Sequence, residues 1–287
     1  MEGLKFVLRL QRRPRAGGRG LPDGKVIPCV SLAVLACVAM AACSGASMPG
    51  TSQPSNPTAL WSAGMETGDL SEWNAPKTNP GGDVENIGNA SAAASNDFAH
   101  TGKSSAKLTI TTLGAQESGA QLFRWDEPDR NPQLYYSAWY YFPQSFSPTL
   151  FWNLMEWKST HLVSGVKTND PFFSLEVGAL TSGEMYFYLS DSHTKTTYAQ
   201  SSQAPVPIPV GQWVHVEAFY KSDGNGSGEI RIWQDGTQLW DIANVDTRYA
   251  DGDTEWSVNS YSSGLTPATA TIYVDDAAIS TSQLTAQ

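Results

Sequence analysis

The chain has 287 residues, of which 40% are hydrophobic and 16% are charged, and its formal net charge at pH 7 is -10. Seven of the 18 basic residues and two of the 28 acidic ones lie in the first 42, so the rest of the chain keeps 11 basic and 26 acidic residues. Such an acidic domain excludes nucleic acid and strongly sulfated polymers as partners, and it favours a neutral or weakly acidic ligand unless basic residues are concentrated in one cleft.

The N-terminal region is predicted to be a secretory signal. Basic residues precede an apolar run over 26–42, which ends in Met40-Ala41-Ala42-Cys43. Small residues before a cysteine resemble the bacterial lipobox, in which the cysteine is lipidated. The alternative is a membrane-spanning helix, but the run is short for a span of about 20 residues and contains Pro28.

We therefore expect a lipoprotein signal peptide over 1–42, a flexible linker rich in Ser, Pro and Gly over 43–58, and one domain over 59–287. This order predicts a protein of the bacterial cell envelope, periplasmic or at the cell surface, whose only membrane contact is a lipid anchor at Cys43. The three cysteines all lie in the signal region, so we expect neither disulfides nor a cysteine metal site in the domain.

The domain reads as a succession of short strands separated by turns rich in Pro, Gly, Ser and Asn. A short strand that runs into a polar turn is expected within 59–73, and further strands near 84–87, 101–111, 120–125, 135–142, 152–158, 172–177, 185–189, 257–260 and 269–280. The segment 74–98 is expected to be mostly loop. No segment shows a sustained helical period, so the pattern predicts an all-β sandwich or jelly roll of two antiparallel sheets.

A three-stranded meander is the clearest local prediction, over 212–246. Alternation turns Val214 and Val216 to an apolar side and His215 and Glu217 to the other. Asp235-Gly236 is a dipeptide that favours a type I′ hairpin. The meander needs a second sheet to bury its apolar side.

The same alternation predicts a groove on the face away from the core. It places together Glu156, Lys158, Ser174, Glu176, Tyr186 and Tyr188, and, if the meander belongs to the same concave sheet, His215, Glu217 and Lys221. Carboxylates, cations, phenols and an imidazole on one open surface suit a polysaccharide.

Five segments carry a family resemblance between Trp61 and Ser280. They are Glu66-Thr67-Gly68-Asp69-Leu70, the strand 134–143, Met155-Glu156-Trp157-Lys158, the strand 213–217 and Tyr273-Val274-Asp275-Asp276. In this order they resemble the concanavalin A-like jelly rolls of polysaccharide lyases, the heparin-lyase and glucuronan-lyase-like group in particular. The resemblance implies cleavage of a uronic-acid polymer by β-elimination.

That resemblance also implies roles for individual side chains. Tyr186 or Tyr188 would be the acid and base, and His215 the base or an orienting group. Lys158 or Arg124 would neutralise the substrate carboxylate. Glu156 stands where alginate lyases have a glutamine, so it must be protonated, paired with Lys158 or used otherwise. The residues expected to bind substrate are Glu176, Glu217, Trp152 and Lys221.

Several such sandwiches hold a structural Ca²⁺ between their first turn and last strand. Glu66, Asp69, Asp275 and Asp276 would be its ligands here. The alternative is that the aspartates accept hydrogen bonds from loop amides.

Three other functions stay open. The domain could bind a glycan without cleaving it, act as a glycoside hydrolase with two of Glu156, Glu176 and Glu217, or serve as an adhesion lipoprotein. The Glu-x-Asp-x-x-Glu strand of laminarinase-type jelly rolls is missing. In every case we expect a monomer.

Overall fold

The computed structural model describes residues 59–74, 80–114, 116–202 and 204–284. The predicted signal peptide, the linker and Cys43 lie outside the described residues. Within the described ranges no helix is long and apolar enough to cross a membrane.

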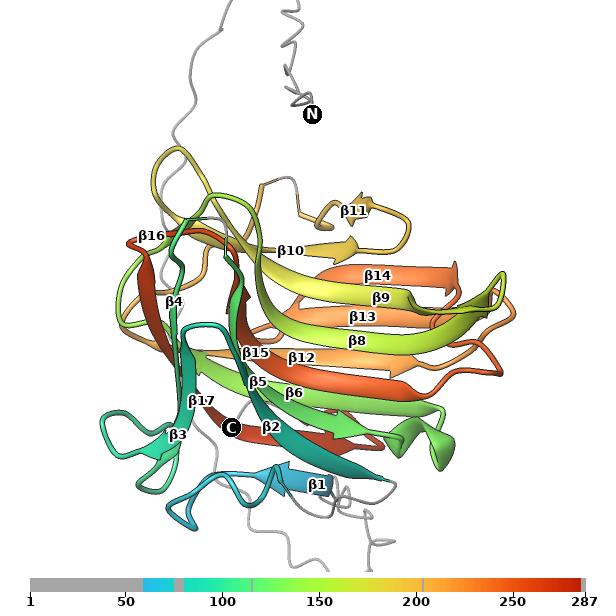
Figure 1. The fold of residues 1–287 in the computed structure, drawn as a ribbon, viewed down its shortest axis with the longest axis horizontal. Helices are drawn as coiled ribbons and strands as arrows, with labels where there is room; N and C mark the ends of the chain where they lie inside the picture. The colour runs from blue at the N-terminus through green and yellow to red at the C-terminus, as the bar shows by residue number, and fades with distance from the viewer. Residues whose placement is uncertain (1–58, 75–79, 115, 203, 285–287) are drawn as a thin grey trace, which may run out of the picture. The chain divides into compact units, whose positions relative to one another are not determined.

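Two antiparallel sheets make up the domain (Figure 1). The first, sheet A, has the order β14 (Thr237–Val245), β13 (Gly228–Gln234), β12 (Trp213–Lys221), β6 (Gln133–Tyr141), β17 (Thr269–Ser280), β4 (Ser105–Thr111) and β3 (Ala90–Ser95), with β1 (Ala59–Ala63) also on β17. The second, sheet B, has the order β11 (Thr196–Tyr198), β10 (Met185–Asp191), β9 (Val166–Ala179), β8 (Trp152–Val163), β15 (Thr254–Ser262), β5 (Ser118–Trp125) and β2 (Gly81–Ile87). A separate pair joins β7 (Ser147–Pro148) to β16 (Leu265–Thr266).

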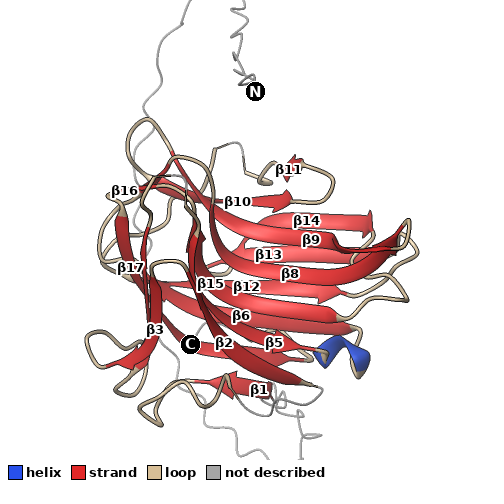
Figure 2. Ribbon diagram, viewed as in Figure 1, coloured by secondary structure: helices blue, strands red, loops and turns tan. Residues whose placement is uncertain are grey.

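The core lies between the two sheets. Leu175 on β9 and Val216 on β12 are both fully buried. Aromatic rings bridge the layers: Trp157 of β8 stacks on Tyr220 of β12 with ring centroids 5.7 Å apart. In the described part of the chain the only helix is one turn of 3-10 helix, η1 (Glu127–Asp129), so the all-β jelly roll is confirmed (Figure 2).

The meander forms as expected, as β12, β13 and β14. Asp235 and Gly236 have φ angles of 47° and 77°, the left-handed values that a type I′ turn requires at both positions. However, β12 pairs with β6 and therefore belongs to sheet A. Its outward side chains consequently face away from sheet B.

Two further elements differ from the sequence prediction. The Ala- and Ser-rich segment Ala90–Ser95, expected to be loop, is strand β3 at the edge of sheet A, where it pairs with β4. Because Ala and Ser are both small, this segment lacks the alternation of large apolar and polar side chains by which a strand is recognised in a sequence. Strands β8 and β9 also run on to Val163 and Val166, where they form a long hairpin.

Candidate active site

The outer face of sheet B carries the largest group of predicted functional residues. Along β9 and β10, Leu175 and Phe187 point into the core, so Glu176 and Tyr188 point outward. The strand register places Tyr188 opposite Glu176, and Glu176 opposite Asn153 of β8. These three residues form a row across the middle of three adjacent strands.

Tyr188 and Glu176 are hydrogen-bonded to each other. The Tyr188 hydroxyl donates to Glu176, which also accepts from the Ser190 hydroxyl. Burial is the main cause that raises the pKa of Tyr188, and the nearby Glu176 carboxylate raises it further. The phenol therefore keeps its proton at neutral pH, which is the form that a general acid must have before it reacts.

Tyr186 lies on the same face, with its ring centroid 6.5 Å from that of Tyr188. The ring covers Gly178, its partner in the strand register. A Cβ at Gly178 would lie 2.6 Å from Tyr186 Cζ. The ring can adopt this position only because the facing residue has no side chain.

Glu156 lies on β8 beside Asn153. Its side chain is buried and accepts a hydrogen bond from the Asn153 amide, and its carboxylate is 3.5 Å from Lys158 Nζ. Burial raises the pKa of Glu156, while Lys158 and the Asn153 hydrogen bond oppose that rise. Glu156 is therefore both paired with Lys158 and shifted toward its protonated form.

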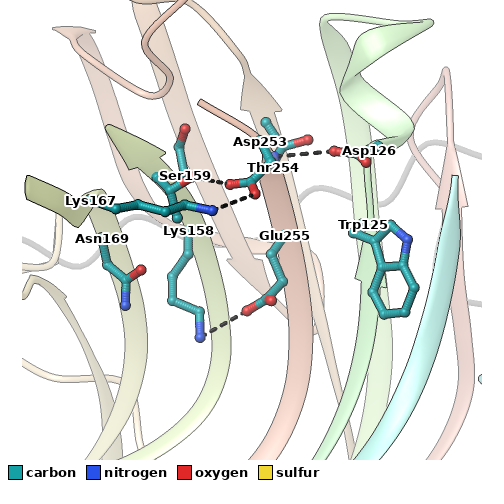
Figure 3. A pocket seen from close by; sticks show the side chains of 10 residues that line it. Trp125, Asp126, Lys158, Ser159, Lys167, Asn169, Asp253, Thr254 and Glu255 are labelled. Carbon is teal, nitrogen blue, oxygen red and sulfur yellow. Dashed lines mark hydrogen bonds and ion pairs between the residues drawn. The ribbon is translucent and has the colours of Figure 1, made fainter. Parts of the chain in front are cut away.

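Lys158 lies further along β8, in register with Phe172 and Glu255 rather than with Tyr188. Its Nζ is 2.8 Å from Glu255 and lies 5.5 Å from the Phe123 ring centroid and 5.4 Å from that of Phe172. Burial alone would lower the pKa of Lys158, but Glu156 and Glu255 outweigh it and the pKa is raised. Lys158 therefore stays a cation in the hollow beside the row (Figure 3).

At a pH high enough to ionise Glu156, replacing Lys158 with methionine is expected to lower the free energy of unfolding by about 3 kcal/mol, because it leaves the buried Glu156 carboxylate without its cation. Adding Glu156→Gln should restore most of that loss. Urea unfolding of the single and double variants measures both effects. A double variant no more stable than Lys158→Met would contradict this pairing.

Three predicted site residues lie on the other sheet. His215, Glu217 and Lys221 are all on β12, so the expectation that they share the groove is wrong. The His215 ring stacks on Trp139 with centroids 4.8 Å apart, and Glu217 accepts a hydrogen bond from the Leu284 amide at 2.6 Å. Alternation identifies the outward side chains of a strand but not the sheet to which the strand belongs.

Two more predicted residues are inside the protein. Trp152 is fully buried and its Nε1 donates to Ser260, so it belongs to the core and not to a substrate surface. Arg124 is also buried, with its guanidinium 2.7 Å from Glu127 and over the Trp61 ring. It faces the opposite way from the hollow and does not fit the role of neutraliser.

Burial lowers the pKa of His215 to about 4, and the neighbouring His100 adds to this effect. The unfolded chain binds a proton at this histidine near pH 6.5, whereas the folded protein binds it only as the pH approaches 4. The free energy of unfolding is therefore largest above pH 6.5 and falls as the pH drops toward 4. We expect His215 to account for a loss of about 3 kcal/mol between pH 7 and pH 4. Denaturant titrations of His215→Gln at both pH values should show a smaller loss than the parent; an equal loss would contradict the assignment.

Comparison with known proteins decides the family. A family model described as "Polysaccharide lyase" matches residues 65–278. The chain belongs to the polysaccharide lyase family. Among curated proteins, none matches its sequence.

Solved structures support the fold of this polysaccharide lyase family member. The endo-β-1,4-glucuronan lyase of the fungus Trichoderma reesei superposes with a TM-score of 0.54 at 15% identity, covering 78% of this chain and 96% of the other. The marine PL-14 alginate lyase from Aplysia kurodai gives a TM-score of 0.51 at 12% identity, covering 77% and 98%. At these identities the likeness establishes the jelly roll alone.

The predicted calcium ligands of this lyase family member are engaged with protein donors. Asp275 accepts from the amides of His100 and Asp276, and Asp276 from the side chains of His100 and Thr101. Glu66 accepts from the amides of Lys103 and Ser104, whereas Asp69 is bonded to Thr67 and Ser71.

Within the described residues no group of three or more His, Cys, Asp and Glu side chains converges on one point. The calcium site over Glu66, Asp69, Asp275 and Asp276 stays a prediction.

Several residues of the open face were not among the sequence predictions. They are Asn153, Ser190, Glu255, Phe123, Phe172 and Trp125. The alternation of β5 and β15 could have placed Phe123 and Glu255, since Leu122 and Trp256 are buried. The expected strand at 257–260 began too late to include Glu255.

Proposed function

We propose that the chain cleaves a uronic-acid-containing polysaccharide by β-elimination on the open face of sheet B. The observation that carries the proposal is the hydrogen-bonded pair of Tyr188 and Glu176, in one strand register with Asn153 and beside the buried Glu156. Membership of the polysaccharide lyase family supports it. A phenol that keeps its proton and a carboxylate in contact with it are an acid and a base in one unit.

Elimination breaks the C5–H and C4–O4 bonds of a uronosyl residue and forms a C4=C5 double bond. Glu176 takes the C5 proton, and Tyr188 donates its proton to the departing O4. The proton on Glu176 then passes to Tyr188 across their hydrogen bond, which returns both groups to their starting forms.

Negative charge grows on the substrate's carboxyl group as the C5 proton leaves. Asn153 and protonated Glu156 would stabilise that charge by hydrogen bonding. The raised pKa of Glu156 favours the form that can donate. Lys158 lies 3.5 Å from Glu156 and 2.8 Å from Glu255, so it helps to hold the Glu156 carboxyl group in place.

A panel of uronic-acid polymers tests the proposal. Polyglucuronate, polymannuronate and polygalacturonate are incubated with the domain, and unsaturated uronate is followed by its near-ultraviolet absorbance. New absorbance on at least one polymer supports elimination. New reducing ends without absorbance would show a hydrolase, and retention on a polymer without products would show a binding module.

We also propose that the protein is exported and anchored by lipid at Cys43 in a bacterial cell envelope. The basic segment, the apolar run over 26–42 and the small residues before Cys43 support this. Incorporation of labelled fatty acid into the parent chain but not into Cys43→Ser is the expected result; equal labelling of both would contradict it.

A further inference from the structure

The open face of sheet B contains two hollows, and most of the charged side chains that line them are acidic. Two adjoining hollows share Trp125, Lys158, Asn169 and Glu255 and together form one groove, here called the sheet B groove. The carboxylates that line it are Asp83, Glu85, Asp126, Glu156, Asp253 and Glu255, and the cations are Lys158 and Lys167. The formal charge of this lining is therefore negative.

Both lysines of the groove are already paired with protein carboxylates. Lys158 Nζ lies 2.8 Å from Glu255, and Lys167 Nζ lies 3.4 Å from Asp253 (Figure 3). Lys158 Nζ is also 3.5 Å from Glu156. Neither lysine is therefore available to neutralise a charged group of the substrate. A cleft lined by one sign of charge concentrates the opposite sign and repels its own.

A polymer of free uronic acid carries one negative charge on every uronosyl residue, so each sugar that enters this groove meets carboxylates. Esterified uronosyl residues carry none. The apolar walls of the groove, which include Phe123, Phe172 and Trp125, suit a substrate of low charge.

We propose that the sheet B groove is specific for uronosyl residues whose carboxyl groups are esterified. This inference rests on the proposed eliminative function and names its substrate class. An ester also fits the groups near Tyr188, because Asn153 and a protonated Glu156 can donate hydrogen bonds to an ester carbonyl without supplying a full positive charge.

The chemistry of an ester matches this site. An ester withdraws electrons from C5 more strongly than a carboxylate does, so its C5 proton is more acidic and a carboxylate base such as Glu176 suffices. The C5–H electron pair becomes the C4=C5 double bond, and the C4–O4 pair leaves with O4. Tyr188 protonates O4, and the ester remains intact in the unsaturated product.

The test compares one polyuronate in its methyl-esterified and de-esterified forms. We expect kcat/KM for the ester to exceed that for the free acid by about tenfold at low salt. Added salt should raise the rate on the free acid, because it screens repulsion, and leave the rate on the ester unchanged. A free acid cleaved as fast as the ester at low salt would overturn the inference.

A substitution at the rim gives a second readout. Glu85 is exposed on β2 and lies outside the Tyr188 row. Glu85→Gln should raise the ratio of kcat/KM for the free acid to kcat/KM for the ester by about twofold. Asp241→Asn removes an equivalent exposed charge on β14 of sheet A and should leave this ratio as it is in the parent. Equal effects of the two substitutions on the free acid would count against a groove-specific field.

Binding separates this inference from the proposed function. If neither polymer yields unsaturated product, the eliminative function fails. Calorimetric titration of the unmodified domain with matched ester and acid oligosaccharides then decides the specificity: tighter binding of the ester supports it, and equal or tighter binding of the acid overturns it.

Discussion

Tyr188→Phe is expected to lower kcat for eliminative cleavage by about 10²- to 10⁴-fold while the protein stays folded, because the variant has no proton to give to the departing O4. Phenylalanine keeps the ring on the open face and removes only the hydroxyl that donates to Glu176. Release of unsaturated uronate under substrate saturation measures kcat.

The partner of Tyr188 provides the decisive contrast. Glu176→Gln should reduce kcat to a similar extent, and the double variant should be little slower than either single one, because the two groups act as one unit. Tyr135→Phe removes a phenol from β6 of sheet A and serves as the matched control. A Tyr188→Phe enzyme within threefold of the parent would contradict the assigned role.

Glu156 should tolerate glutamine but not alanine. An amide can still donate a hydrogen bond to the substrate's carboxyl group, so Glu156→Gln is expected to retain kcat within about tenfold, whereas Glu156→Ala should lose about 10²- to 10³-fold. Both variants leave Lys158 paired with Glu255, so the cation is not left alone. Activity of each variant on the polymer that the parent cleaves measures the difference.

The pH profile makes this test sharper. The parent needs a protonated Glu156, whose pKa is raised by burial, so its activity should decline as the pH rises through that pKa. The amide of Glu156→Gln does not titrate, and the decline should disappear. If glutamine is as damaging as alanine, Glu156 acts as a base and the proposed role is wrong.

The faces of the strands could be predicted from the sequence, but their assignment to sheets could not. Alternation placed Val214 and Val216 in the core and His215 outside it, and the buried side chains agree. Both sheets of a sandwich show the same alternation, so nothing in β12 distinguishes one sheet from the other. The pairing of β12 with β6 depends on contacts between residues about 80 positions apart in the chain.

Local rules also failed where a strand is irregular or where a polar group is buried. In a regular strand the adjacent Asp275 and Asp276 would point to opposite faces. Both contact His100 instead, because the strand register shifts after Asp275 and Asp276 has a φ angle of 45°. Arg124 looked available on sequence grounds because the sequence does not show that Glu127, three residues later, turns back to pair with it.

Gly178 has a practical consequence for engineering. Its backbone forms the floor beneath the Tyr186 ring, and even one methyl group there would collide with that ring. An alanine at this position would tilt the phenol away from the strand while leaving every acidic side chain of the groove in place. Gly178 is thus a position at which the placement of the Tyr186 ring can be altered separately from the charges of the sheet B groove.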